Sequence, residues 1–176
     1  MGPFLFTVAI LLVFAILIGA MWLGWNRRRR RQAYIPVAPE LPAGLGQPTL
    51  AVEDAHYVAT SVTGDALDRI AVRPLAYRGR AEVEVHPEGV AIAITGERAF
   101  FIPTDSITLV ALGQATIDRA VEPNGLTVIQ WNLGEGENTT SVETYLRVPS
   151  PAVRRELLDA LSQISELSNA TREEHK

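Results

Sequence analysis

The sequence contains no cysteine, and this absence removes several kinds of chemistry. Without thiols the chain forms no disulfide, no thiolate metal site and no cysteine nucleophile. Histidine is also scarce: His56, His86 and His175 are the only three, and they lie in unrelated positions. A metal centre needs several ligands at a recognisable spacing, such as H-E-x-x-H, which these histidines do not show. We therefore predict no metal and no cofactor.

The sequence also lacks the motifs of the common catalytic folds. It has no G-x-S-x-G elbow, no P-loop and no dinucleotide-binding fingerprint. Two pairs of carboxylates, Asp65 with Asp68 and Glu82 with Glu84, are the nearest approach to an acid–base pair. Acidic residues at such short spacing are more typical of the solvated face of a strand. We predict no catalytic residue and no enzymatic activity.

Positive charge is scarce beyond residue 31. The chain has 16 Lys and Arg against 20 Asp and Glu, and five of the basic residues are consecutive, Arg27 to Arg31. Removing these five leaves 11 basic against 20 acidic residues in 32–176, a net charge of −9. Nucleic-acid binding depends on attraction between basic side chains and phosphates, so we exclude nucleic acid as a partner.

What the sequence does contain, at its start, is an uncharged apolar run from Phe4 to Trp25. About 20 apolar residues in a helix cross the hydrocarbon core of a bilayer. Trp22 and Trp25 stand at the end of the run, where aromatic side chains prefer the headgroup layer. Arg27, Arg28, Arg29, Arg30 and Arg31 follow, and we expect them to contact lipid headgroups. The sequence predicts a single transmembrane anchor over residues 1–26.

The arginine block also predicts orientation, because Lys and Arg beside a spanning helix stay on the cytoplasmic side. No basic residue precedes the run, so we expect the N-terminus outside and residues after 31 in the cytoplasm, at the inner (plasma) membrane. A cleavable signal peptide would carry its charge before the apolar core. A core helix of a soluble protein rarely lacks charge over such a length. Both alternatives are disfavoured.

Residues 27–50 read as a polybasic junction followed by a proline-rich linker. Pro36, Pro39, Pro42 and Pro48 favour extended polyproline geometry and remove backbone donors. The pattern predicts either a semi-rigid spacer or a disordered tether.

Residues 51–170 have the length of one domain, and most of their periodicity is that of strands. Val83 and Val85 alternate with charged residues, and a His86–Gly89 turn leads into a second strand, 90–94. We expect further strands at 55–61, 70–73, 98–102, 107–112, 126–131 and 141–148. The sequence predicts a mainly-β domain.

An amphipathic helix is expected at the end of the domain. Ser150 suits the N-cap and Pro151 the first helical position. Val153, Leu157, Leu161 and Ile164 recur at helical spacing. We predict a helix of about four turns that covers one side of the sheet, followed by a polar tail over 171–176.

Taken together, the chain resembles the actinobacterial single-pass membrane proteins that carry a cytoplasmic pleckstrin-homology-like (PH-like) domain. The resemblance rests on the anchor–arginine junction and on the segments Tyr77–Val83, Phe100–Pro103 and Thr127–Trp131. It implies an antiparallel β-barrel or sandwich capped by the C-terminal helix, and a binding rather than a catalytic role.

Four arginines form the one candidate ligand site. Arg69, Arg73, Arg78 and Arg80 lie within 12 positions of one another. Arginine offers bidentate donors to phosphate, and a basic loop of this kind resembles the headgroup site of phosphoinositide-binding PH domains. The alternative is a set of surface arginines neutralised by neighbouring carboxylates, a common arrangement that constrains exposed side chains weakly.

Two main hypotheses follow. The first is a membrane-anchored adaptor that presents its domain to a protein partner, with strand addition beside Ser141–Val148 as one mode of contact. The second is a domain that binds an anionic lipid or metabolite through the arginine cluster. A third is an accessory subunit of a membrane enzyme or transporter, with the apolar helix as the interface.

Overall fold

The computed structural model describes residues 2–31, 35–113 and 125–174 of the 176-residue chain. The chain divides into two compact units, Met1–Tyr34 and Ile35–Lys176. The boundary follows the arginine block, so the apolar helix and the β-sheet belong to separate units.

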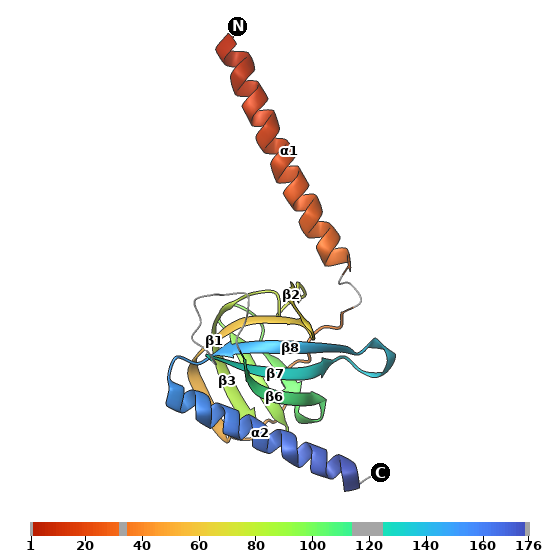
Figure 1. The fold of residues 1–176 in the computed structure, drawn as a ribbon, viewed down its shortest axis with the longest axis vertical. Helices are drawn as coiled ribbons and strands as arrows, with labels where there is room; N and C mark the ends of the chain where they lie inside the picture. The colour runs from red at the N-terminus through yellow and green to blue at the C-terminus, as the bar shows by residue number, and fades with distance from the viewer. Residues whose placement is uncertain (1, 32–34, 114–124, 175–176) are drawn as a thin grey trace. The chain divides into compact units, whose positions relative to one another are not determined.

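The described residues of the first unit form one helix, α1 (Gly2–Arg31), drawn in red and orange in Figure 1. Its segment Phe6–Gly24 has a mean hydropathy of 2.7 over 19 residues, and none of that segment is buried. At 1.5 Å per residue it spans about 28 Å, close to the thickness of a bilayer's hydrocarbon core. The helix is therefore long and apolar enough to cross a membrane. The helix continues past residue 26, the expected end of the anchor, and includes the backbone of the arginine block.

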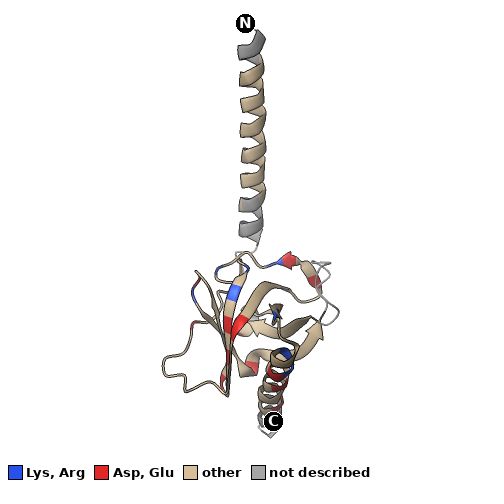
Figure 2. Cartoon of the chain, turned by 90° about the vertical axis from the view of Figure 1, so that its left-hand side faces the viewer, with Lys and Arg blue, Asp and Glu red and all other residues tan. Residues whose placement is uncertain are grey.

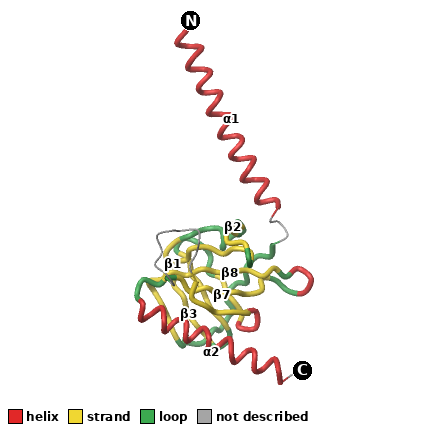
Figure 3. Tube along the Cα trace, viewed as in Figure 1, coloured by secondary structure: helices red, strands yellow, loops and turns green. Residues whose placement is uncertain are grey.

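The second unit is built on eight antiparallel strands and one long helix (Figures 1 and 3). The strands are β1 (Leu50–Val62), β2 (Asp65–Arg69), β3 (Gly79–His86), β4 (Gly89–Ile94), β5 (Phe100–Pro103), β6 (Ile107–Gly113), β7 (Leu126–Leu133) and β8 (Thr140–Arg147). Two 3-10 turns, η1 (Thr104–Ser106) and η2 (Gly136–Asn138), and the helix α2 (Pro151–Glu174) complete it. The predicted fold, a mainly-β domain with a C-terminal helix, is confirmed.

In the hairpin of β3 and β4, burial follows the alternation of apolar and charged residues in the sequence. Val83 and Val85 are fully buried, whereas Glu82 before them is exposed and Glu84 between them is half-buried. The chain reverses at residues 87–88, and Gly89 begins β4 with φ +155°. A Cβ at Gly89 would lie 2.3 Å from the carbonyl oxygen of Ile102, so only glycine fits there.

The sheet curls round a single main core. Its strand order is β5-β4-β3-β1-β8-β7-β6, with β2 attached to β1. The two end strands, β5 and β6, are consecutive in sequence and joined only by the three residues of η1. Because so short a turn holds the ends of the sheet close together, the intervening strands must bend round the side chains between them. Tyr57, Phe100 and Trp131 are among the largest fully buried side chains there.

Helix α2 packs against β6 and η1, and also against β1 and β3. Leu157, Leu161 and Ile164 are buried, which confirms the predicted apolar stripe. Ser150 begins the helix as expected: its carbonyl accepts a hydrogen bond from Arg154 N–H at 2.9 Å. The helix runs for 24 residues, about seven turns, and not the four that we predicted. It includes residues 171–174 of the expected polar tail.

The expected linker is in part a packed segment. Ile35 and Ala38 are buried in the core, and Pro39 C=O accepts a hydrogen bond from Phe101 N–H on β5 at 2.9 Å. Glu40 forms an ion pair with Arg98. The compact unit therefore begins at Ile35, whereas the prolines led us to expect a domain starting at residue 51. The backbone groups of a short extended segment can form their hydrogen bonds with the edge of a sheet as well as with water.

Two local predictions were wrong. The strand expected at residues 70–73 lies instead at Asp65–Arg69, and Ile70 is a buried residue just beyond it. The edge expected beside Ser141–Val148 is interior, because β8 pairs with β1 on one side and β7 on the other. Alternation along one strand shows which side chains face the core, but not which strand lies beside it.

Candidate binding surfaces

Two of the four arginines of the predicted ligand site, Arg69 and Arg80, lie at separate positions along β1. In the sheet register, Arg80 on β3 lies opposite His56 of β1, and Arg69 on β2 lies opposite Ser61 of β1. Five positions along a strand correspond to roughly 16 Å. The domain thus holds the two ends of the cluster apart.

Arg73 is held locally. Its Nη2 donates to Tyr77 Oη at 3.1 Å, and its guanidinium lies 5.1 Å from the centre of the Tyr77 ring. Its Nε is also 3.9 Å from Glu97 Oε2. The hydrogen bond to Tyr77, followed by the charge of Glu97, raises the pKa of Arg73 above its usual value. The side chain remains 73% exposed, so these contacts can be exchanged for others at little cost.

The other arginines also have partners within the chain. Arg80 Nη2 lies 2.9 Å from Asp54 Oδ1 in an exposed ion pair. Arg69 Nη2 donates to the carbonyl of Val58 at 2.5 Å. Arg78 is exposed and is likewise engaged. Figure 2 shows acidic segments near the basic ones on the strands. The arginine side chains of the predicted site thus each interact with a partner within the protein.

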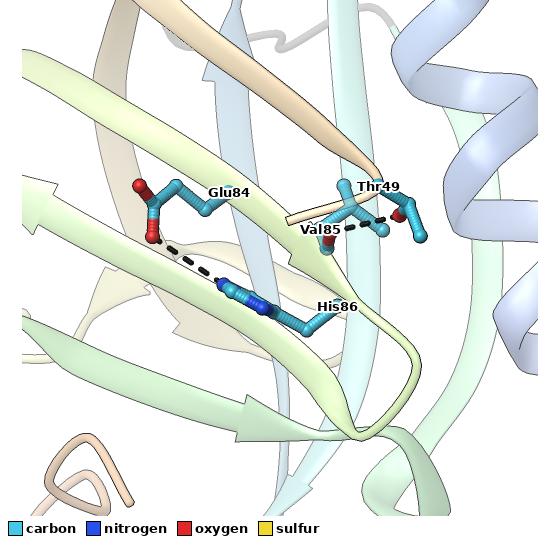
Figure 4. Close-up of polar contacts among 4 residues, drawn as sticks. All are labelled: Thr49, Glu84, Val85 and His86. Carbon is cyan, nitrogen blue, oxygen red and sulfur yellow. Dashed lines mark hydrogen bonds and ion pairs between the residues drawn. The ribbon is translucent and has the colours of Figure 1, made fainter. Parts of the chain in front are cut away.

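One of the three histidines, His86, is buried beside a carboxylate. His86 has a side chain only 2% exposed, and its Nε2 lies 3.3 Å from Glu84 Oε2 (Figure 4). Next to it, Thr49 Oγ1 donates to Val85 C=O at 2.8 Å. His56 lies on β1, and His175 is outside the described residues. Across residues 2–31, 35–113 and 125–174, no group of three or more His, Asp and Glu side chains is placed to hold a metal ion.

Of the residues predicted to lie at a membrane interface, only Trp22 has a described side chain, and it is exposed. The side chains of Trp25 and of Arg27, Arg28, Arg29, Arg30 and Arg31 fall outside the described part of the structure. Their backbone is helical.

Sequence reasoning did not find a sizeable cleft in the described part of the domain. It has a volume of about 500 Å³ and lies between the packed segment after Ile35, the β5–η1 corner and the β7–β8 hairpin. Val37, Pro39, Pro103, Asp105, Ser106, Asn132, Gly134, Glu135, Gly136 and Thr139 line it. The lining mixes two prolines with five polar or acidic side chains. No signal in the sequence marked it, because its walls come from three separate segments.

The neighbours of the two end strands of the sheet, β5 and β6, are a second feature that the sequence did not predict. The β5 end is covered by the Pro39 segment, through the hydrogen bond from Phe101 N–H. At the other end, β6 pairs with β7 from Ile107 to Gly113, with a shift of register between Ile107 and Leu109. Within the described ranges, no strand pairs with the outer side of β6. The two ends of one sheet therefore differ.

A family model described as bacterial PH domain-like matches residues 35–162. The match begins where the second compact unit begins and includes every strand and half of α2. No curated protein matches the chain.

Proposed function

Because the chain belongs to the bacterial PH domain-like family, we propose that it is a non-enzymatic binding module anchored in a membrane. One observation supports this above all: a helix of membrane-spanning length is followed by five arginines and then at once by the family domain, which starts at residue 35. PH-like domains are typically binding modules, although a scaffold by itself does not determine the ligand.

The arginine block supports a specific orientation. Basic residues beside a spanning helix are retained on the cytoplasmic side. In our proposal the chain crosses the inner membrane once, with residue 2 outside and the domain in the cytoplasm.

We propose that the domain binds a protein. Its charge of −9 over residues 32–176 opposes close contact with anionic lipid, which favours a protein surface over the bilayer. A shared membrane raises the effective concentration of a membrane-associated partner, so that even a weak contact is occupied.

A second candidate is the binding of an anionic headgroup or metabolite at the arginine cluster. Arg73 and Arg80 favour it, because their side chains are 73% and 71% exposed and their present partners are exchangeable. The separation of Arg69 and Arg80 along β1 weighs against a single phosphate site.

The first experiment is affinity purification of the full-length protein from its host's membranes in mild detergent. The control is a truncated chain ending at residue 34, which retains only the helix and arginine block. Proteins recovered with the full chain and not with the control would support a protein-binding module. Equal recovery with both would refute it, and liposome binding by an Arg73→Ala/Arg80→Ala variant would then test the second candidate.

A further inference from the structure

The cleft beside the β7–β8 hairpin is formed by walls that contact one another. The segment after Ile35 is joined to β5 by the hydrogen bond from Phe101 N–H to Pro39 C=O, over 2.9 Å. The hairpin lies so close to the same segment that a Cβ added at Gly134 would be only 2.5 Å from Pro36 Cγ. The cleft is therefore shaped in advance. Its volume of about 500 Å³ is typical of pre-formed ligand sites, which range over roughly 300–1,000 Å³.

The floor and the rim of this cleft differ in charge. The floor consists of half-buried residues without charge: Pro39, Pro103, Ser106, Asn132 and Gly134. The rim consists of exposed residues, of which Asp105 and Glu135 are acidic and none of those described is basic. Lysine and arginine side chains combine an apolar stem with a cationic head. Such a side chain can lay its stem on the prolines of the floor and direct its charge to the rim.

Two polar side chains of the cleft are available to a ligand. Among the described residues, none forms a hydrogen bond or an ion pair with the Glu135 carboxylate or with the Asn132 side-chain amide. Asp105 already interacts within the protein, so Glu135 is the carboxylate that remains for a cation. The Asn132 amide has both donors and an acceptor, and a peptide backbone presents the complementary groups.

The charge of the domain restricts what occupies the cleft. Residues 32–176 carry a net charge of −9, which attracts a basic ligand and repels an anionic lipid, a nucleic acid or a second copy of the domain. A free amine would meet Glu135 but would leave the Asn132 amide without a backbone to bind. An extended basic segment of a protein meets both groups, and a partner held in the same membrane occupies even a weak site.

We propose that this cleft is the docking site of the module and takes an extended basic segment of a membrane-associated protein. The stems of its lysine or arginine side chains pack on Pro39 and Pro103, a cationic head pairs with Glu135, and Asn132 binds its backbone. This assignment rests on the protein-binding function proposed above and adds a surface and a ligand class to it.

The test uses the full-length protein in nanodiscs of zwitterionic lipid, with empty nanodiscs as the baseline. The probe is a short synthetic peptide that alternates arginine with valine. A control peptide carries citrulline at each arginine position, which removes the positive charge but keeps the length of the side chain. Binding is measured by titration at low and at high salt, and by hydrogen-exchange mass spectrometry.

We expect the arginine peptide to slow exchange of the amides of residues 132–139, and the citrulline peptide to bind at least about ten-fold more weakly. Salt should weaken binding of the arginine peptide only. Glu135→Gln should weaken it about three-fold, and Glu135→Arg more. Asn132→Ala should weaken both peptides by the same factor, because this side chain binds the backbone. Glu156→Gln removes a charge from an exposed position on α2 outside the cleft, and this control should bind as the wild type does.

Several results overturn the assignment. One is the absence of binding up to about 1 mM arginine peptide, and another is protection located away from the cleft. Equal binding of the two peptides, or equal effects of Glu135→Gln and Glu156→Gln, would show that the cleft does not select the charge. Spermine that binds as tightly as the arginine peptide would make the ligand a free amine. Self-association of the protein that Glu135→Arg abolishes would make the occupant a second copy.

The same variants separate this proposal from the one beneath it. If the purification recovers a domain-dependent partner and Glu135→Arg retains it fully, the binding function stands and the docking cleft is wrong. If the full-length protein recovers nothing beyond the helix-only control, the proposed function itself fails, and the docking assignment falls with it.

Discussion

The indole Nε1–H of Trp131 on β7 donates a hydrogen bond to Thr144 Oγ1 on β8, over 2.9 Å and within the core. Thr144 in turn lies 2.8 Å from Thr60 Oγ1, and Thr60 lies 2.6 Å from Tyr57 Oη. Tyr57 donates to the carbonyl of Leu75 at 3.1 Å. A carbonyl only accepts and an indole only donates, so every proton in this series of hydrogen bonds points from Trp131 towards Leu75. Each hydroxyl donates once and accepts once.

Removing the middle of this chain should destabilise the domain. Thr144→Val keeps the side-chain volume but leaves the Trp131 N–H and the Thr60 hydroxyl without their partner. An unsatisfied buried polar group costs about 1–3 kcal/mol, and we expect a loss of unfolding free energy in that range. Thr63→Val, at a half-buried hydroxyl that bonds to Ser141, is the control and should lose a few tenths of a kcal/mol. Urea unfolding of the nanodisc-bound protein, followed by circular dichroism, would measure both. Equal losses would contradict the buried chain.

Stability should fall at high pH through two tyrosines. Burial, with the hydrogen bond to Glu143 as a further cause, raises the pKa of the Tyr145 phenol to about 12. Burial likewise raises the pKa of Tyr57 well above its usual value. Unfolded tyrosine ionises near pH 10, so above about pH 10 the folded state binds more protons than the unfolded state, and the unfolding free energy declines as pH rises. Below about pH 10 these two groups should contribute no pH dependence. Unfolding of wild type and Tyr145→Phe across this range would check the sign, with a shallower decline expected for the variant.

Gly89 should tolerate substitution far less than another glycine with positive φ. A Cβ at Gly89 meets the Ile102 carbonyl at 2.3 Å, whereas Gly64, with φ +83°, has open space around it. We expect Gly64→Ala to cost about 1 kcal/mol from backbone strain alone, and Gly89→Ala to cost at least twice as much. Thermal unfolding of the two variants would compare them. Similar costs would mean that the β3–β4 hairpin relaxes freely away from β5.

The segment after residue 34 should contribute to stability as core does. Ile35 is buried, whereas Val37 is 58% exposed. Ile35→Ala should cost about 2–4 kcal/mol, and Val37→Ala less than about 0.5 kcal/mol, because only the first leaves a cavity. Chemical unfolding would distinguish them. A negligible effect of Ile35→Ala would restore the interpretation of residues 35–49 as a spacer.

The proposed orientation can be tested cleanly, since the chain contains no cysteine of its own. Gly2→Cys places a thiol before the apolar segment, and Gln163→Cys places one at an exposed position on α2. In intact cells stripped of any outer envelope, a membrane-impermeant maleimide should label the first variant and not the second. After the membrane is permeabilised, it should label both. The reverse pattern would overturn the positive-inside argument.

The sequence by itself determined whatever depends on neighbours in the chain. The apolar run of α1, the alternation of Val83 and Val85 and the stripe of Leu157, Leu161 and Ile164 are local patterns. Their periods match strand and helix geometry, so the mainly-β domain and its C-terminal helix could be predicted.

Only the tertiary structure decided which strands are paired, covered or free. The residues of β8 predict a strand. Its interior position in the sheet follows from its pairing with β7 on one side and, on the other, with β1, which is distant in the sequence. Pro39 and Phe101 are 62 positions apart, and only the structure shows the hydrogen bond by which a linker-like segment covers β5. The spread of the arginines along β1 is set in the same way. Strand pairing joins residues distant in sequence through backbone groups that every residue carries, so no side-chain pattern marks its partner in advance.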